Sequence, residues 1–306
     1  MGRDATGAPA PAMRNCRASG AAMLGEVLAG GQEVLAWVLL LLGGMSLYDA
    51  LCHTFTTMPT GGFSTRNASI AHYDSVYFDC VFIVFMLMAG INFSLHYQLL
   101  KGRPLAFWQD SECRFFLGTV VLLTIVVSAN LYGSVYATIG NALRYGTFQV
   151  VSLITTTGYA TADYEKWPAM SQLILLLCMF FGASAGSTGG GMKCLRVMLC
   201  FKYCYRELFS LIHPHAVSQI KIGGKAVPDD VMRSVVGFLA LYMGLFALSA
   251  VILAGMGVDF ITAFAAIAAS IGNIGPGFGM GTNPAPRAEE MSVAPRTVEW
   301  SALGSV

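Results

Sequence analysis

The sequence predicts an all-α integral membrane protein in which two membrane spans, with a short half-helix between them, form a repeated unit around a central pore. Charged residues make up only 11% of the 306-residue chain and hydrophobic residues 55%, with a mean hydropathy of +0.62. Soluble domains carry about 25% charged residues, so this chain lacks the charge to cover a water-facing surface. Long uncharged stretches, and apolar stretches interrupted by glycine, indicate the repeated unit.

The uncharged stretches give the candidate spans. A helix needs about 20 apolar residues to cross the hydrocarbon core of a bilayer. The candidates are residues 34–48 extended by 23–28, 76–100, 115–143, 167–192 and 234–258. The span at 76–100 contains one acid, Asp79, which we expect either to attract cations at the outer mouth or to lie at the membrane interface.

Three further apolar stretches contain Gly and Thr clusters that would interrupt a helix. They are residues 50–63, 139–159 and 260–278. Non-helical backbone lies at membrane depth only where protein covers it or where it lines a wet cavity. We therefore expect these stretches to form re-entrant hairpins along a pathway.

Each interrupted stretch carries a related motif in which a glycine precedes an aromatic residue. The motifs are TTMPTGGFST (56–65), ITTTGYAT (154–161) and NIGPGFG (273–279), with the pairs Gly62-Phe63, Gly158-Tyr159 and Gly277-Phe278. Residues 48–57 and 141–155 are predicted to be half-helices before the first two motifs. Packing glycines of ordinary membrane helices are the alternative, but three motifs in the same order favour an internal repeat.

The motifs suit a dehydrated cation. Replacing its water requires a ring of carbonyl or hydroxyl oxygens, and glycine lets successive carbonyls point the same way. Thr60, Thr156 and Thr157 can add hydroxyl oxygens. Half-helices that end at such a segment direct their partially negative C-terminal ends at the cation. His53, on the first predicted half-helix, is expected to be a hydrogen-bonded histidine, with a proton relay as the alternative.

The distribution of basic residues predicts the orientation. The connections at 101–114 and 193–233 hold most of the Lys and Arg residues between the spans, so they are expected in the cytoplasm. The net charge of +1 gives no electrostatic footprint for nucleic acid. No nucleophile, base and orienting group can be assembled from the motifs, so we expect no enzyme.

A glycine-rich stretch, GASAGSTGGGMK at 182–193, interrupts the span at 167–192. It lacks the Gly-Lys-Ser/Thr order of a phosphate-binding loop. A helix kink that allows close packing is one interpretation. A movable loop is the other, because small side chains suit a segment that changes conformation.

These motifs resemble the Trk/Ktr/HKT superfamily of potassium transporters, and most closely its bacterial Trk-type membrane subunit, over roughly residues 25–279. MPTGGFSTRNASI, VVSLITTTGYATADY and ASIGNIGPGFG are similar to the second, third and fourth filter segments of that family. The resemblance implies filter glycines at Gly62, Gly158 and Gly277. It implies further lining oxygens from Thr60, Gly61, Thr156, Thr157, Gly275 and Pro276.

The resemblance also implies a gate and partners. The gate loop would comprise Gly182, Gly186, Ser187, Thr188, Gly189, Gly190 and Gly191. Potassium would be the substrate, bound at the filter residues only, with no covalently bound cofactor. The family implies a homodimer in the bacterial inner membrane and a cytoplasmic nucleotide-binding regulatory subunit of the TrkA type.

The family pattern has four filter segments, whereas this chain offers three. We expect residues 1–25 to be unstructured or non-native, 26–101 to be the second repeat, 102–228 the third repeat with its cytoplasmic connection, and 229–282 a partial fourth repeat. Residues 283–306 read as a polar tail in place of the last span. Both ends thus suggest a truncated chain.

Two alternatives stand beside a potassium-translocating subunit. One is a truncated fragment that inserts without conducting. The other is the potassium-binding subunit of an ATP-driven pump, whose ATPase chains would be separate proteins. Residue chemistry by itself fits potassium or sodium, and channel conduction or symport.

Overall fold

Helices of different lengths follow one another along the chain. The computed structural model describes residues 28–213 and 219–277. The helices are Leu28–Leu42, α2 (Leu47–Thr57), α3 (Val76–Gly90), α4 (Phe93–Leu100), α5 (Ala106–Gln109), α6 (Ser111–Leu131), α7 (Ile139–Ile154), α8 (Ala169–Phe181), α9 (Cys194–Ile212), α10 (Asp229–Gly255) and α11 (Phe260–Gly272). Two short 3-10 helices are η1 (Ser69–Tyr73) and η2 (Tyr164–Lys166), and a hairpin pairs β1 (Lys221–Ile222) with β2 (Lys225–Ala226) in antiparallel register. The fold of the described residues is therefore almost entirely helical.

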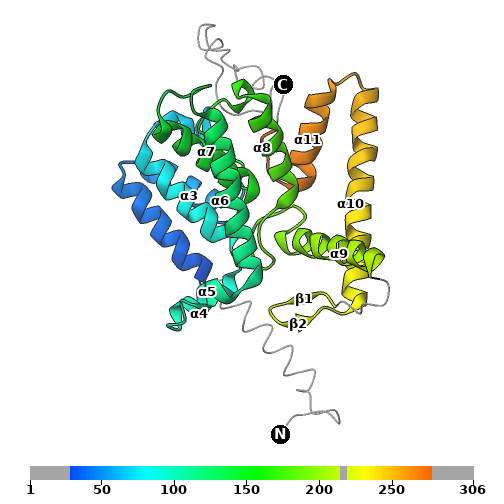
Figure 1. Cartoon of the computed structure of the whole chain (residues 1–306). Helices are drawn as coiled ribbons and strands as arrows, with labels where there is room; N and C mark the ends of the chain where they lie inside the picture. Colours follow the sequence, from blue (N-terminus) through cyan, green and yellow to red (C-terminus); the bar gives the residue numbers. More distant parts are fainter. Residues whose placement is uncertain (1–27, 214–218, 278–306) are drawn as a thin grey trace, which may run out of the picture.

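Helix α7, the half-helix before the motif at 154–161, lies at the centre of the protein. Helix α7 packs against α3, α6 and α8, and its residues 148–154 are all buried. Helices α10 and α11 form an adjoining pair, of which α11 contacts α8, while α9 crosses beneath them (Figure 1). Helix α7 is thus enclosed by neighbouring helices over its C-terminal half.

The predicted spans are shorter and more broken than the uncharged stretches. Among the described residues, two helices, α6 with 21 residues and α10 with 27, are long and apolar enough to cross a membrane alone. Helices α3 and α4 make a third span only if they are counted as one, because they bend by 102° at Ile91 and Asn92. The expected continuous span at 76–100 is therefore wrong.

Local backbone preferences explain the other two differences. Within residues 115–143, helix α6 ends at Leu131, and Gly133 turns the chain with φ 77° before α7 begins. Within residues 167–192, helix α8 ends after 13 residues because Gly182 adopts φ 70°. The lack of charge located these apolar segments correctly, but a glycine with positive φ lies at or just after the end of α6 and of α8.

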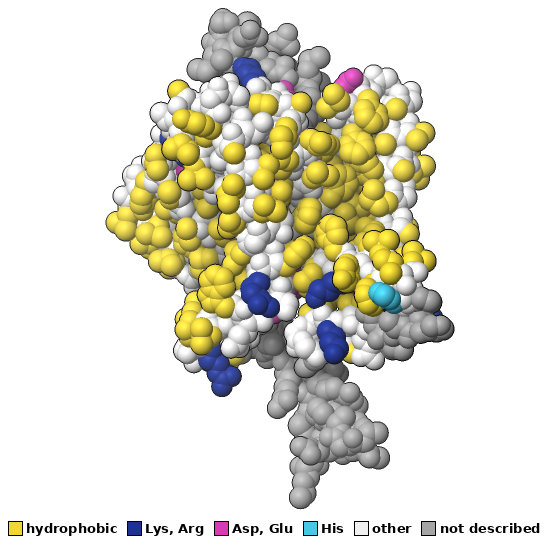
Figure 2. Space-filling model, viewed as in Figure 1, with side chains coloured by type: hydrophobic (Ala, Val, Ile, Leu, Met, Phe, Trp, Pro, Cys, Tyr) yellow, Lys and Arg dark blue, Asp and Glu magenta, His cyan; other side chains and the backbone are white. Residues whose placement is uncertain are grey.

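The surface separates into an apolar zone and a charged end. Hydrophobic side chains cover the middle of the molecule, and most of the visible Lys and Arg side chains lie at the end that contains α4, α5 and α9 (Figure 2). Exposed apolar residues are abundant on α6 and α10, including Val121, Leu122, Leu245 and Val251. This pattern is typical of a protein whose middle faces lipid.

Asp79 is buried and paired, not placed at a mouth for cations. Its Oδ2 atom lies 2.6 Å from Nε of Arg144 on α7, and the guanidinium also reaches Asp74 at 3.1 Å. The pair joins the first turn of α3 to α7. Removing one partner of a buried pair leaves an uncompensated charge.

We therefore predict that Arg144→Met lowers the free energy of unfolding by about 3 kcal/mol, because it leaves the Asp79 carboxylate buried without its partner. Lys166→Met is the matched control: Lys166 is 56% exposed and lies 3.5 Å from Asp163, so its loss should cost about 0.5 kcal/mol or less. Denaturant unfolding in detergent micelles measures both. Equal losses would contradict a structural role for the Asp79–Arg144 pair.

Candidate functional site

Three half-helices end at the same place in the fold. Each begins with a polar cap: Ser46, Thr138 and Asp259 accept hydrogen bonds from the first-turn amides of α2, α7 and α11. Such caps fix where a helix starts. The C-terminal end of each half-helix then leads into one of the predicted filter segments, so three partially negative ends converge on one region.

The three segments share one backbone conformation. In each, a residue in the left-handed region is followed two positions later by a glycine with positive φ. The pairs are Thr60 (57°) with Gly62 (65°), Thr156 (60°) with Gly158 (87°), and Asn273 (55°) with Gly275 (99°). The residue between them donates its amide to the last turn of the half-helix, from Gly61 to Thr56 O (2.7 Å), Thr157 to Ser152 O (2.9 Å) and Ile274 to Ala269 O (2.8 Å).

By this conformation, Gly275 is the residue of the fourth segment that corresponds to Gly62 and Gly158, whereas the motif predicts Gly277. Gly277 does not have positive φ, and its carbonyl oxygen accepts a hydrogen bond of 2.7 Å from the hydroxyl of Tyr164. Matching each glycine to a following aromatic residue misplaced the register, because helix α11 ends at Gly272 and the turn begins at Asn273. Phe278 lies outside the described residues.

The segments touch each other without space for a side chain. A Cβ atom on Gly62 would overlap the carbonyl oxygen of Thr157, and a Cβ on Gly158 would overlap that of Ile274. The second segment therefore adjoins the third, and the third adjoins the fourth. Glycine is required at both positions for contact as well as for conformation.

A cavity of about 340 Å³ lies between the second and fourth segments. It is lined by residues 59–63 on one side, residues 273–276 on the other, and Gly158 from the third segment. The predicted residues Thr60, Gly61, Gly275 and Pro276 therefore line one space, while Thr156 and Thr157 are fully buried behind it. Within residues 28–213 and 219–277, no group of three or more His, Cys, Asp or Glu residues could hold a metal ion.

The glycine-rich stretch after α8 lies directly against the three segments. Thr188 donates from its hydroxyl to Met58 O (2.8 Å), and its own carbonyl accepts from the hydroxyl of Thr60 (3.2 Å). The amide of Gly190 donates to the hydroxyl of Thr156 (2.6 Å). A Cβ on Gly190 would come within 2.6 Å of Gly272 O, at the end of α11. One loop thus contacts the end of every half-helix.

Two charged side chains hold this loop at its flanks. The buried carboxylate of Glu112, at the start of α6, accepts the amide of Ala185 at 2.5 Å. Lys193, which has φ 67°, donates from its ammonium to the carbonyl oxygens of Ser187 (3.3 Å) and Gly189. The loop also lies beside the bend between α3 and α4, where the amide of Phe93 donates to Gly186 O at 3.2 Å.

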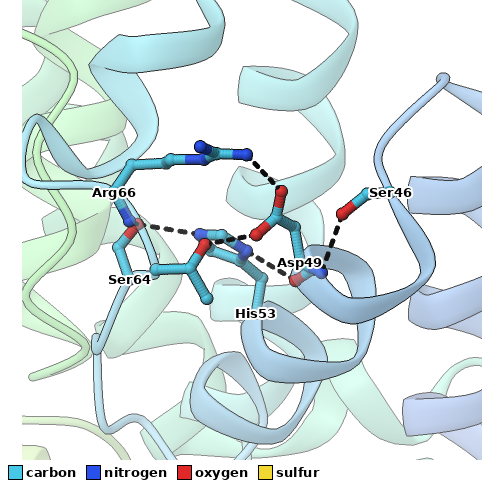
Figure 3. A network of polar contacts seen from close by, with 6 residues as sticks. Ser46, Asp49, His53, Ser64 and Arg66 are labelled. Carbon is cyan, nitrogen blue, oxygen red and sulfur yellow. Dashed lines mark hydrogen bonds and ion pairs between the residues drawn. The ribbon is translucent and has the colours of Figure 1, made fainter.

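A polar network supports the second segment from the outer side of α2. Arg66 pairs with Asp49 (2.8 Å), and the hydroxyl of Thr65 donates to the same carboxylate (2.6 Å) (Figure 3). The hydrogen bond from Thr65, together with those from Arg66 and Ser46, holds the pKa of Asp49 well below its ordinary value, although burial opposes the shift. The segment that follows Gly62 is thereby fixed to the first turn of the half-helix.

The same network places His53 as a buried, hydrogen-bonded side chain. Its Nδ1 atom lies 2.6 Å from Asp49 O and its Nε2 atom 2.9 Å from the hydroxyl of Ser64 (Figure 3). Both ring nitrogens therefore have partners, as the first sequence interpretation expects. No sequence motif indicates Asp49, Arg66 or Glu112, because the fold brings each of them together with its partners.

Comparisons with known proteins agree with this geometry. The TrkH family model, described as a cation transport protein, matches residues 30–294. The Trk system potassium uptake protein TrkH of Escherichia coli (strain K12) is 42% identical over 243 residues, which cover 78% of this chain and 50% of the relative. TrkI of Halomonas elongata is 33% identical over 257 residues, covering 83% of this chain and 52% of the relative.

A solved structure shows the same architecture. The crystal structure of the potassium transporter TrkH from Vibrio parahaemolyticus superposes with a TM-score of 0.78 at 38% identity, covering 81% of this chain and 54% of that one. The chain thus spans about half the length of the curated relatives and of the solved protein that it matches.

We predict that Gly275→Ala is more damaging than Gly277→Ala. Only Gly275 has positive φ, and an alanine there should cost about 1–2 kcal/mol in backbone strain, whereas a Cβ on Gly277 meets its nearest atoms at 3.4 Å. Thermal unfolding of both variants, with and without potassium chloride, provides the comparison. A larger loss of thermal stability for Gly277→Ala would show that Gly277, and not Gly275, corresponds to Gly62 and Gly158.

Proposed function

Because this chain belongs to the TrkH family of cation transport proteins, we propose that it forms part of the potassium-translocating pathway of a Trk-type uptake system. The observation that carries the proposal is the contact of three filter segments, each at the C-terminal end of a half-helix. Backbone carbonyls of these segments replace the water around a potassium ion. The ion is the substrate, and no covalent step or bound cofactor is involved.

The backbone geometry of the three segments supports a set of oxygen ligands. Each segment supplies oxygens from one side. The contributing residues are Thr60 to Gly62, Thr156 to Gly158, and Asn273 to Gly275. The ends of α2, α7 and α11 add partial negative charge without an acidic ring. The cavity between the second and fourth segments is where the first filter segment of the family pattern would complete the ring, supplied by a longer form of this protein or by another polypeptide.

The loop at 182–193 acts as a gate in this proposal. It lies against the ends of the three half-helices, where it would close the pathway, and it is built from small residues that can rearrange. Its contacts with Thr60 and Thr156 support this role, because moving the loop changes hydrogen bonds made by the filter segments themselves.

Location and partners complete the proposal. The end of the molecule that contains α4, α5 and α9 carries most of the basic side chains and faces the cytoplasm of a bacterium, with the apolar middle in the inner membrane. A homodimer of the subunit is regulated by a cytoplasmic nucleotide-binding protein of the TrkA type that docks on this end. The relatives are Trk system proteins, which favours this subunit over the potassium-binding subunit of an ATP-driven pump.

Rubidium uptake tests the pathway. In cells without their own potassium transporters, the chain should support uptake, and Gly158→Ser should lower the preference for potassium over sodium at least tenfold, because its side chain would meet Ile274 O. Gly118→Ser on α6 is the matched control, since a Cβ there has open space, and it should change nothing.

The outcomes separate the alternatives. Uptake with unchanged selectivity in Gly158→Ser would remove Gly158 from the filter. If uptake requires the addition of a first repeat and a final span, the present residues are a non-conducting portion of the pathway. No uptake by either form would contradict the proposed function.

Deletion of Gly189 to Gly191 tests the gate. The deletion removes the contacts with Thr156 and with the end of α11, so we expect a severalfold higher rubidium flux without the regulatory partner. Combining the deletion with Gly158→Ser should keep the higher flux but lose its potassium preference, which shows that the ions still pass the filter. Unchanged or lower flux would argue against a gate.

A further inference from the structure

The side chain of Tyr159 crosses from the third filter segment into the second unit. Its hydroxyl oxygen lies 2.7 Å from Oγ1 of Thr56, 3.1 Å from Oγ1 of Thr57 and 3.1 Å from the carbonyl oxygen of His53. All three partners lie in the last two turns of α2. A residue next to one filter glycine thus binds the half-helix that leads to another.

The ring of Tyr159 is fixed in this position. It is fully buried, with its edge against Phe82 at a centroid distance of 5.2 Å. Its carbonyl oxygen accepts a hydrogen bond of 2.7 Å from the hydroxyl of Ser152 on α7. The residue is therefore held at its backbone by α7 and at its hydroxyl by α2.

The partners of Tyr159 hold the second filter segment. The carbonyl oxygen of Thr56 accepts the amides of Gly61 (2.7 Å) and Gly62 (3.1 Å), and its hydroxyl donates to Phe63 O (2.8 Å). A displacement of Thr56 would consequently move the backbone on both sides of Gly62. Tyr159 is in contact with the one residue that anchors this segment at three points.

We propose that Tyr159 is a positioning residue for ion selectivity, which sets the distance between the second and third filter segments through its hydroxyl. This role rests on the proposed function, since ion selectivity requires a filter. The residue does not touch the ion, because its side chain is fully buried behind the segments. It acts on the carbonyl positions, and the number and field of the carbonyls decide which cation replaces its water most favourably.

The corresponding aromatic of the second segment has a different environment. Phe63 has no hydroxyl and is 76% exposed. Of Phe63 and Tyr159, Tyr159 is therefore the one that joins two units. Its hydroxyl lies behind the place where the backbones of Gly62 and Thr157 meet without side chains, and it adds to the hydrogen bonds that the neighbouring Ala160 makes with Ala71 and Ser69.

The test is the ratio of potassium to sodium affinity of the purified full chain in detergent micelles. Each salt is titrated against thermal unfolding, since an ion that binds the folded state raises the melting temperature. Tyr159→Phe removes one oxygen and keeps the ring. We expect the ratio to fall about threefold to tenfold, the range of one ordinary buried hydrogen bond. Tyr242→Phe, which removes a buried hydroxyl with no hydrogen-bond partner among the described residues, should leave the ratio unchanged.

A second variant separates positioning from general stability. Thr57→Val removes a partner of the Tyr159 hydroxyl and keeps the side-chain shape. As a single substitution it should lower the potassium-to-sodium affinity ratio, and combined with Tyr159→Phe it should lower the ratio little further. It also serves as the test if Tyr159→Phe does not fold. A lower melting temperature with an unchanged ratio in both variants would overturn the proposal. A wild-type chain that prefers neither ion would overturn the proposed function as well.

Discussion

The fold depends on direct backbone contact between neighbouring filter segments. Gly62 lies against the carbonyl of Thr157, and Gly158 against that of Ile274, with no space for a Cβ atom. Ridges of side chains normally separate packed elements in proteins, so this contact requires each segment to be fixed from behind. The three half-helices provide that support, because every segment donates an amide to the last turn of its own helix.

The same exclusion of side chains extends to the loop beneath the segments. Gly189 and Gly190 leave no room for a Cβ beside Thr155 O and Gly272 O. The glycines of this loop are consequently needed for contact with the half-helix ends as well as for mobility. Glu112 and Lys193 fix the loop by its backbone groups, so its position does not depend on side-chain packing at its centre.

The apolar stretches before the glycine motifs located the first two half-helices, but the motifs did not fix the register of every segment. Residues 48–57 and 141–155 were expected, and the structure has Leu47–Thr57 and Ile139–Ile154. In the fourth segment, the glycine-aromatic pattern selected Gly277, whereas backbone conformation selects Gly275. The pattern records residue types, while the register is set by where α11 ends. Contacts such as Glu112 with Ala185 join residues far apart in sequence, and no local pattern indicates them.

Two of the half-helices are fixed at both ends, which explains the charged residues within an otherwise apolar protein. Asp49 binds Arg66 at the start of α2, and Arg144 binds Asp79 and Asp74 near the start of α7. The Asp79–Arg144 pair is the more buried of these contacts, and removing one partner of a buried pair leaves an uncompensated charge. At their other ends, α2 and α7 meet through Tyr159. An ion pair near the start of each of these two half-helices and a shared hydroxyl near their ends leave each half-helix little freedom to slide, which keeps the carbonyls at its end in one position.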